Sequence, residues 1–228
     1  MGVVIPGVKI FTDSAFVVSA DLGQSNDPTA LCVMERLVHS EVTWKGRETR
    51  KSEEFLVRHL RRLPLGLSYV DQVRDVANLL NREPLNSRTP LVIDETGVGR
   101  PVGDLFNSLG LHPTRVTITA GDGQSLKSAN RWSVAKGLLI SALDARLHTG
   151  ELKIAQGMAE AETLREELKD FQRHVSAAGR YSYDARTGKH DDVLLAVALS
   201  LWHFVSKPKP QQPAQMVHAR LVPTLTTE

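Results

Sequence analysis

The sequence has little cysteine, little net charge and no long hydrophobic run. Its single cysteine, Cys32, excludes a disulfide within the chain and any zinc site built from several cysteines. No apolar segment approaches the roughly 20 residues that a membrane-spanning helix needs. Residues 1–20 also lack the charged start and the long apolar stretch of a secretion signal. These absences favour a cytoplasmic protein that does not enter a membrane.

The low net charge restricts how the chain can bind a polyanion. The formal net charge of the 228 residues is +2, so any basic binding surface has to be local. Hydrophobic residues make up 41% of the chain and charged residues 24%. This composition is typical of a globular protein, and the length allows one large domain or two small ones, each with a real core.

The chain is expected to form one domain with two loose ends. Pro208, Pro210, Pro213 and Pro223 cluster near the end of the sequence, so residues 207–228 are predicted to be a flexible, proline-rich tail. Residues 1–14 are predicted to be an N-terminal leader. The domain itself is expected to span residues 15–206.

Hydrophobic periodicity predicts an α/β fold in which strands come first. Strands are expected over 15–20, 29–37, 54–60, 91–93 and 116–119, and helices over 69–81, 101–109, 133–147, 159–174 and 191–205. A loop is expected over 121–125. This order favours a mixed central β-sheet flanked by helices.

Acidic residues stand where two predicted strands end and where the last helix begins. Asp21 follows the first apolar run, Asp94 follows Leu91–Ile93, and Asp191 and Asp192 precede the last apolar helix. Taken singly, each acid is most simply a turn residue or a helix cap. Taken together, they carry a stronger implication, because the last helix is apolar on nearly all sides and has to be buried against the sheet.

Buried carboxylates that meet at one point predict a cation site. Such groups are unfavourable without partners or cations, and three or four would converge if the strands ending at Asp21 and Asp94 are neighbours. Ligand sets made only of oxygen favour Mg²⁺ or Mn²⁺ over zinc. Two such ions about 3.5–4 Å apart suit an in-line displacement at phosphorus.

Three segments of the chain resemble, in order, the nuclease domain of tailed-phage large terminase subunits. They are Asp21-Leu-Gly-Gln-Ser-Asn-Asp-Pro-Thr-Ala30, Val92-Ile-Asp-Glu-Thr-Gly-Val-Gly99 and His190-Asp-Asp-Val-Leu-Leu-Ala-Val-Ala-Leu199. Residues 58–66 and 164–171 show weaker likenesses. The resemblance implies an RNase H-like (RuvC-like) fold, with which the predicted order of elements agrees.

The resemblance also implies an activity and a set of site residues. It implies an endonuclease that uses two Mg²⁺ or Mn²⁺ ions to cut concatemers of double-stranded viral DNA during genome packaging, in the cytoplasm of a bacterial host. Asp21 and Asp94 match the acids of the family's first and fourth strands. The third acid lies in the pair Asp191 and Asp192, and the sequence leaves open which of the two ligates metal.

Two further residues are candidates beside the acids. Glu95 stands where the family usually has a small residue, and alternation along a strand predicts that it points away from Asp94. His190 precedes the acidic pair and is a candidate to orient a ligand, although a solvated loop histidine is the simpler interpretation.

Basic residues offer local surfaces for DNA. The candidates are Arg58 and Arg61 in the basic stretch 45–62, Lys136 near the start of a predicted helix, and Arg180, Arg186 and Lys189 in a predicted hairpin over 179–189. Phosphate contacts from such residues give affinity without sequence preference. A solvated charged surface explains the same residues without any function.

Part of a large terminase has no counterpart in this sequence. The packaging ATPase of the family carries a P-loop, G-x-x-x-x-G-K-[ST], and no such motif occurs here. The resemblance therefore implies a nuclease domain alone, either excised or naturally truncated. Its expected partners are double-stranded DNA, a packaging ATPase domain, a portal protein and a small terminase subunit.

Three alternatives share parts of the pattern. A RuvC-like junction resolvase or an RNase H-type nuclease would use the same acids on other nucleic acids. An actin-like ATPase or sugar-kinase fold shares the strand-Asp-x-Gly opening at Asp21, but it normally needs a longer chain and a later Gly-Gly motif. A non-catalytic interaction domain could retain the fold without the chemistry.

Overall fold

A computed structural model describes residues 8–23, 27–43, 48–86, 88–155, 157–175, 181–185 and 190–205. For residues 8–10, 43, 48–51, 170–175 and 181–185 the structure describes the backbone alone. The predicted tail over 207–228 and the first residues of the predicted leader lie outside the described residues.

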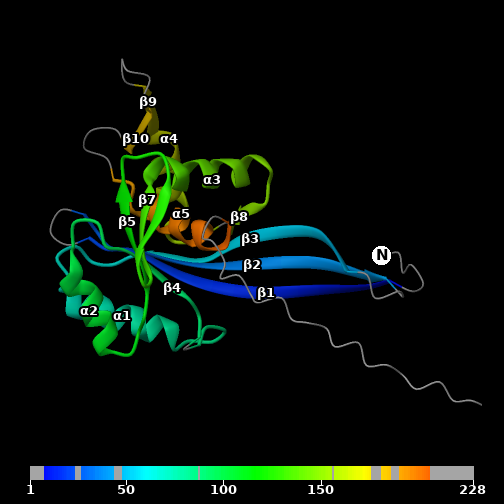
Figure 1. Ribbon diagram of the computed structural model, residues 1–228, viewed down its shortest axis with the longest axis horizontal. Helices are drawn as coiled ribbons and strands as arrows, with labels where there is room; N and C mark the ends of the chain where they lie inside the picture. The colour runs from blue at the N-terminus through cyan, green and yellow to red at the C-terminus, as the bar shows by residue number, and fades with distance from the viewer. Residues whose placement is uncertain are drawn as a thin grey trace, which may run out of the picture.

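An eight-stranded mixed sheet forms the centre of the fold, in the order β6-β7-β5-β4-β1-β2-β3-β8 (Figure 1). Its strands are β1 (Val8–Asp21), β2 (Ala30–Thr43), β3 (Glu48–Arg62), β4 (Leu91–Asp94), β5 (Thr114–Thr119), β6 (Gln124–Ser128), β7 (Arg131–Ala135) and β8 (Leu152–Ile154). The first three strands pair antiparallel. Strands β4, β5 and β7 continue the sheet in parallel from β1, so their carboxyl ends share one edge with the end of β1.

Helices cover both faces of the sheet. Figure 1 shows α1 (Tyr69–Leu80) and α2 (Arg100–Ser108) below it, and α3 (Lys136–His148), α4 (Ala161–Asp170) and α5 (Asp192–Val205) above it. Because alternate residues of a strand face opposite sides, neighbours such as Val17 and Val18 enter two different cores. None of the helices in the described part of the chain is long and apolar enough to cross a membrane.

Helix α5 is the most deeply buried helix of the upper layer. Its residues from Asp192 to Trp202 are all buried. The hydroxyl of Ser19 in β1 donates to the backbone oxygen of Ala196 over 2.6 Å and lies 2.7 Å from the hydroxyl of Ser200. These contacts place α5 along β1, which directs the first turn of the helix toward the carboxyl end of that strand.

The first three strands are much longer than the sequence predicts. Together they extend beyond the helices as a three-stranded arm (Figure 1). Strand β1 begins at Val8 rather than at residue 15, so residues 8–14 of the predicted leader pair with β2. Polar residues interrupt the apolar pattern in this arm, which is why hydrophobic periodicity recovers only the inner part of each strand.

Several predicted elements are confirmed and others are wrong. The helices predicted over 69–81 and 101–109 are α1 and α2, each within one residue at both ends. The helix predicted over 133–147 is wrong at its start, because residues 133–135 belong to β7. The predicted loop over 121–125 ends in the first residues of β6.

The segment before α5 also differs from the prediction. The helix predicted over 159–174 is wrong at its end, because α4 stops at Asp170 and β9 (Phe171–Val175) follows at once. Strand β9 pairs antiparallel with β10 (Tyr181–Ala185) in a separate two-stranded sheet. The described hairpin therefore begins at Phe171, well before the start predicted at residue 179.

Candidate active site

Asp21 and Asp94 occupy equivalent positions at the ends of neighbouring strands. They are register partners in the parallel pair β1 and β4, and register partners of parallel strands point to the same face. That face is the one covered by α5: Ser19, two residues before Asp21, bonds to α5, and Val92, two residues before Asp94, packs in the same core as α5.

Asp191 and Asp192 join these two acids from the start of α5. The helix begins at Asp192, and the backbone oxygen of Asp191 accepts a hydrogen bond from the backbone N–H of Leu195 over 2.8 Å. The carboxylates of Asp94, Asp192 and Asp191 all raise the pKa of Asp21 through their charges. The structure therefore brings the four acids singled out in the sequence to one place.

The negative charge of this cluster is only partly offset. Burial is the main cause that raises the pKa of Asp21 well above its usual range, followed by the three neighbouring carboxylates, while Lys136 lowers it. Burial also raises the pKa of Asp94 to about 6, against hydrogen bonds from Thr96 that lower it. The backbone N–H of Thr96 donates to Asp94 Oδ1 over 2.7 Å. Asp94 and Asp192 are buried, whereas Asp21 and Asp191 are partly exposed. Carboxylates gathered in this way have the donor chemistry of a divalent-cation site.

Cationic side chains engage the two acids of α5 differently. Lys136 Nζ lies 2.7 Å from Asp191 Oδ2. The guanidinium of Arg62, at the end of β3, binds both oxygens of Asp192, with Nε 2.7 Å from Oδ2 and Nη2 2.8 Å from Oδ1. As the described side chains stand, no three His, Cys, Asp or Glu residues are arranged to hold a metal ion.

Glu167 is a fifth acid that the sequence did not single out. Its Oε1 accepts a hydrogen bond from Arg62, and its Oε2 accepts one from the backbone N–H of Leu194 over 2.7 Å. Burial is the main cause that raises its pKa to about 8. The network of Arg62, Asp192 and Glu167 thus ties β3 and α4 to the first turn of α5.

The sequence held only weak signals for this network. Glu167 lies in the segment 164–171 whose resemblance was weak, and Arg62 closes the basic stretch 45–62. Neither signal distinguishes Glu167 from its neighbour Glu166, or Arg62 from Arg61, because the distinction depends on which side chain faces α5.

Glu95 is turned away from the carboxylate cluster. It is buried beside two cations, with its Oε1 3.5 Å from Arg115 Nη1 and 3.3 Å from Arg131 Nη2. This contact set agrees with the predicted alternation after Asp94. The tight packing around Arg115 includes Gly103, where an added Cβ would lie 2.2 Å from the guanidinium carbon.

His190 connects the start of α5 to the loop after β1. Its Nδ1 lies 2.9 Å from Asp27 Oδ1, and both side chains are exposed. The same loop is held tightly at Gly23, whose backbone N–H donates to Thr29 Oγ1 and whose backbone oxygen accepts from Gln72 Nε2, each over 2.9 Å. Gly23 and Asp27, two described residues of this loop, are thus each bonded to side chains outside it or at its end.

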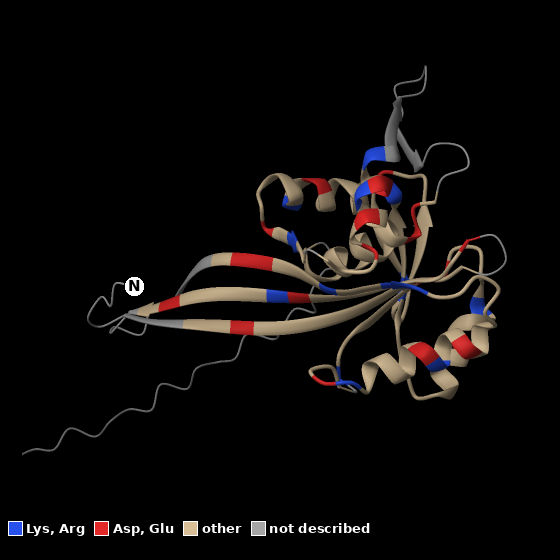
Figure 2. Cartoon of the chain, turned by 180° about the vertical axis from the view of Figure 1, so that it is seen from behind, with Lys and Arg blue, Asp and Glu red and all other residues tan. Residues whose placement is uncertain are grey.

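The candidate DNA contacts lie in several places. Arg58 Nη2 is 2.6 Å from Glu35 Oε2, and Arg61 Nη2 is 3.1 Å from Asp75 Oδ2. Both arginines therefore stand in partly exposed ion pairs on β3, whereas Lys136 lies at the carboxylate cluster. Figure 2 shows basic and acidic residues interspersed along the helices. Arg180, Arg186 and Lys189 lie outside the described residues.

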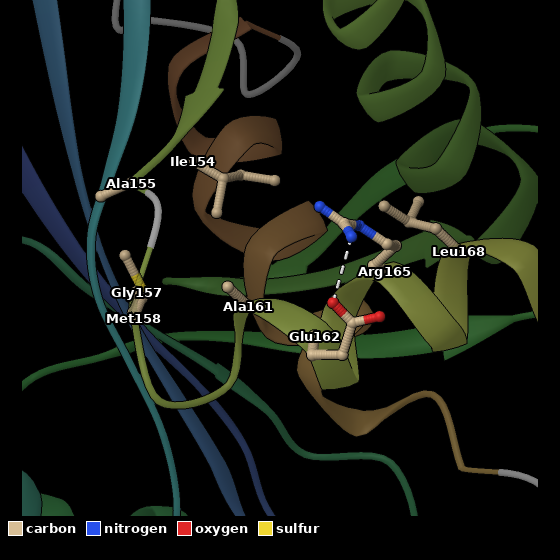
Figure 3. A pocket seen from close by; sticks show the side chains of 8 residues that line it. All are labelled: Ile154, Ala155, Gly157, Met158, Ala161, Glu162, Arg165 and Leu168. Atoms are coloured by element: carbon tan, nitrogen blue, oxygen red, sulfur yellow. Dashed lines mark ion pairs between the residues drawn. The ribbon is translucent and has the colours of Figure 1, made fainter.

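One pocket lies away from the carboxylates. It has a volume of about 410 Å³ and is lined by the β8–α4 segment, including Ile154, Met158 and Leu168 (Figure 3). On its α4 side, Glu162 Oε2 and Arg165 Nη1, one turn apart on the helix, form an ion pair at 3.2 Å. None of the four clustered acids lines this pocket, so it is separate from the candidate active site.

Among known proteins, only solved structures match this chain, and they share its fold. No protein-family model matches the sequence, and no curated protein matches it either. Solved structures do match over most of the chain. The large terminase nuclease from thermophilic phage G20c superposes with a TM-score of 0.58 at 20% identity, covering 84% of this chain and 83% of that chain.

Two further comparisons agree with the first. Structures of the G20c nuclease with bound magnesium and with bound cobalt match with TM-scores of 0.55 and 0.57, each at 21% identity over 83% of this chain and 81% of that chain. The large terminase nuclease domain of Thermus phage P74-26 matches with a TM-score of 0.55 at 18% identity, over 86% of this chain and 82% of that chain. These likenesses confirm the predicted RNase H-like fold, a mixed sheet flanked by helices, in the form seen in large terminase nucleases.

Proposed function

We propose that this protein is a metal-dependent endonuclease that cleaves double-stranded DNA. The observation that carries the proposal is the register of Asp21 with Asp94, beside Asp191 and Asp192 at the start of a buried helix. The fold supports the same function, because the solved structures with this fold are named as terminase nucleases, and two of them are named with bound magnesium or cobalt.

The donor set at the cluster fits Mg²⁺ or Mn²⁺. All four candidate ligands offer carboxylate oxygens, which hard divalent cations prefer. The side chain of Asp21 has no hydrogen bond or ion pair to any described residue, and Asp94 accepts only from Thr96. We propose that Asp21 and Asp94 hold metal together with an acid from 191–192, and that two ions bind.

Each side chain then has a definite task. When bound, such ions supply an activated water and stabilise the departing 3′ oxygen, leaving 3′-hydroxyl and 5′-phosphate ends. Asp21 and Asp94 fix the ligand positions because both end strands of one rigid sheet. Arg62 and Glu167 orient the start of α5, and the pair of His190 and Asp27 fixes the loop beside Asp21.

The substrate and partners follow from the same proposal. Arg58, Arg61, Lys136, Arg180, Arg186 and Lys189 remain the predicted contacts with DNA phosphates. We propose that the chain acts in viral genome packaging in a bacterial host, together with a packaging ATPase domain, a portal protein and a small terminase subunit.

A plasmid cleavage assay tests the proposal. Purified protein should nick and linearise supercoiled plasmid in the presence of Mg²⁺ or Mn²⁺, and EDTA should stop the reaction. Asp21→Asn and Asp94→Asn should each lower the rate by roughly 100-fold or more, since each removes a proposed ligand. Asp144→Asn is the matched control, because Asp144 is exposed in α3 beside His148.

The same assay separates the alternatives. A junction resolvase would prefer branched DNA, and an RNase H-type enzyme would prefer RNA–DNA hybrids. Plasmid left intact with every divalent ion, or full cleavage by Asp21→Asn, would rule out the proposed endonuclease.

A further inference from the structure

Lys136 stands at the same edge of the sheet as the acids. It begins α3 directly after β7, and β7, β5, β4 and β1 run parallel, so their carboxyl ends lie along one edge. Its ammonium lies 2.7 Å from Asp191 Oδ2, and the two side chains are only 20% and 21% exposed. This ion pair is therefore shielded from water more than a surface pair.

The ammonium of Lys136 acts on more than one carboxylate. Its charge lowers the pKa of Asp21 and also the pKa of Asp94, while it contacts Asp191 directly. One cation thus offsets acids from three separate elements, β1, β4 and the start of α5. A divalent ion bound by the same acids would compete with the ammonium of Lys136 for the same carboxylates.

We propose that Lys136 is a tethered counter-ion of the metal site, which pairs with Asp191 in the metal-free protein and is displaced from it when a divalent cation binds. The proposal rests on the proposed function, since it assumes that the cluster binds metal. Lys136 stabilises the metal-free cluster and weakens metal binding by the same interaction, because an ion that Asp191 helps to hold has to break the contact between Asp191 and Lys136.

The proposal predicts a different change in metal affinity, when Lys136 is removed, from that of the two simpler roles of a lysine at this position. If Lys136 were only a structural salt-bridge partner, its removal would loosen the site and weaken metal binding. If it acted only on DNA phosphate, its removal would leave metal affinity unchanged. A competing counter-ion is the one role in which removal of the ammonium tightens metal binding.

Calorimetric titration of the whole chain with Mn²⁺, without DNA and at one fixed pH, tests the sign. Lys136→Met should bind Mn²⁺ about tenfold more tightly than the wild type, the size expected for coupling between contacting charges. Lys136→Arg keeps the charge and should stay near the wild-type affinity. Lys153→Met is the control, because Lys153 forms an ion pair with Glu54 at the same 2.7 Å distance but on β8.

Thermal unfolding supplies a second readout. In EDTA, Lys136→Met should melt about 2–4 °C below the wild type, and saturating Mn²⁺ should remove that difference, because metal takes over the task of the ammonium. Affinity of Lys136→Met equal to or weaker than that of the wild type would overturn the inference. Failure of this variant to fold in saturating Mn²⁺ would overturn it too.

The outcomes also separate this inference from the proposed function. Wild-type protein that binds no Mn²⁺ would overturn both. Wild-type protein that binds Mn²⁺ and cleaves DNA, together with a Lys136→Met variant that gains no affinity, would overturn only the role of Lys136.

Discussion

Asp21 and Asp94 face each other across two parallel strands, β1 and β4, as direct register partners. Parallel neighbours place such side chains on one face at a separation typical of adjacent strands, about 4.8 Å. Two carboxylates held that close repel each other: burial is the main cause that raises the pKa of Asp21, and the charge of Asp94 is the next. The metal-free fold therefore carries an electrostatic cost at its candidate active site.

The first prediction is that removing one of these charges stabilises the metal-free protein. In EDTA at neutral pH, Asp21→Asn should raise the stability by roughly 1 kcal/mol, which corresponds to about 2–4 °C in the melting temperature of a chain of this size. The reason is that the amide keeps the shape of the carboxylate and loses its unfavourable charge. The melting temperature should be compared with that of Asp144→Asn, an exposed control.

Asp21→Asn should change the stability of the metal-free protein and its stabilisation by metal in opposite directions. Asp21→Asn should be more stable without metal but should gain less stability from Mn²⁺ than the wild type does, because it loses a proposed ligand. A lower melting temperature in EDTA would mean that Asp21 is a structural acid, satisfied in the native fold, rather than a strained one.

The second prediction concerns pH. Burial raises the pKa of Asp94 from 3.8 to about 6, so the folded protein holds this proton more tightly than the unfolded chain does. Stability from this group is present below about pH 3.8 and is lost as the pH rises to about 6, by roughly 3 kcal/mol at most. Glu167, whose pKa is raised to about 8, extends the same trend toward neutral pH.

Melting temperatures in EDTA between pH 4.5 and 7.5 test this trend. The wild type should lose stability across the range, and Asp94→Asn should lose less, because one of the responsible groups no longer titrates. Saturating Mn²⁺ should reverse the slope in the wild type, since metal binds the deprotonated carboxylates. Identical slopes for the wild type and Asp94→Asn in EDTA would contradict the assignment.

The starts of two helices show where the sequence predicts an element boundary correctly and where it does not. Helix α1 has a clear apolar stripe and a cap, since Ser68 Oγ accepts from the backbone N–H of Asp71, and its bounds were predicted within one residue. Helix α3 has no such signal: its cap position is Ala135, which makes no side-chain capping bond. Strand β7 runs into α3 without a turn, so the pattern alone extended the helix backward over residues 133–135.

The candidate site shows the same division. Acids at the ends of apolar runs are visible in the sequence, and their convergence follows from strand order and from the burial of α5. The pairing of these acids is not visible, because Arg62, Lys136 and Glu167 come from segments far apart in the chain. Lys136 was a candidate, but for DNA phosphate, and the sequence did not pair it with Asp191. Only the fold shows that Arg62 faces α5 while Arg61 pairs with Asp75 on the opposite layer.

The third prediction is that Arg62 is essential for stability. Arg62→Met leaves Asp192 and Glu167 buried without their shared partner, and breaking a buried pair in this way typically costs about 3–5 kcal/mol. Arg62→Lys should recover only part of the loss, because an ammonium cannot bind both oxygens of Asp192 as the guanidinium does. Urea unfolding measures both effects.

The control for Arg62 is Arg74→Met. Arg74 pairs with Asp71 at 2.8 Å on the exposed side of α1, and exposed pairs of this kind contribute at most about 1 kcal/mol. Equal losses for Arg62→Met and Arg74→Met would show that the network at the start of α5 is no stronger than a surface contact.

The fourth prediction is that Gly23 is required for the geometry of the loop after Asp21. A Cβ at this position would lie 2.0 Å from the backbone oxygen of Asp27 and 2.7 Å from that of Pro28. Because both atoms belong to the backbone, Gly23→Ala has to move the loop, at a cost of about 1–3 kcal/mol. The variant should also lose cleavage activity, since the loop leads directly from Asp21 and carries Asp27, the partner of His190.

Gly123→Ala separates this effect from a general loss of backbone freedom. Gly123 precedes β6, has open space where its Cβ would be and has no positive φ. Its backbone oxygen accepts from the backbone N–H of Ala135, a contact that alanine keeps, so its substitution should change neither the melting temperature nor the cleavage rate by much. If Gly23→Ala retains wild-type cleavage, the loop is free to adjust and the position of Asp21 is set by β1 alone. If it loses cleavage while Mn²⁺ still stabilises it, the loop acts on DNA or on alignment of the reaction rather than on metal binding.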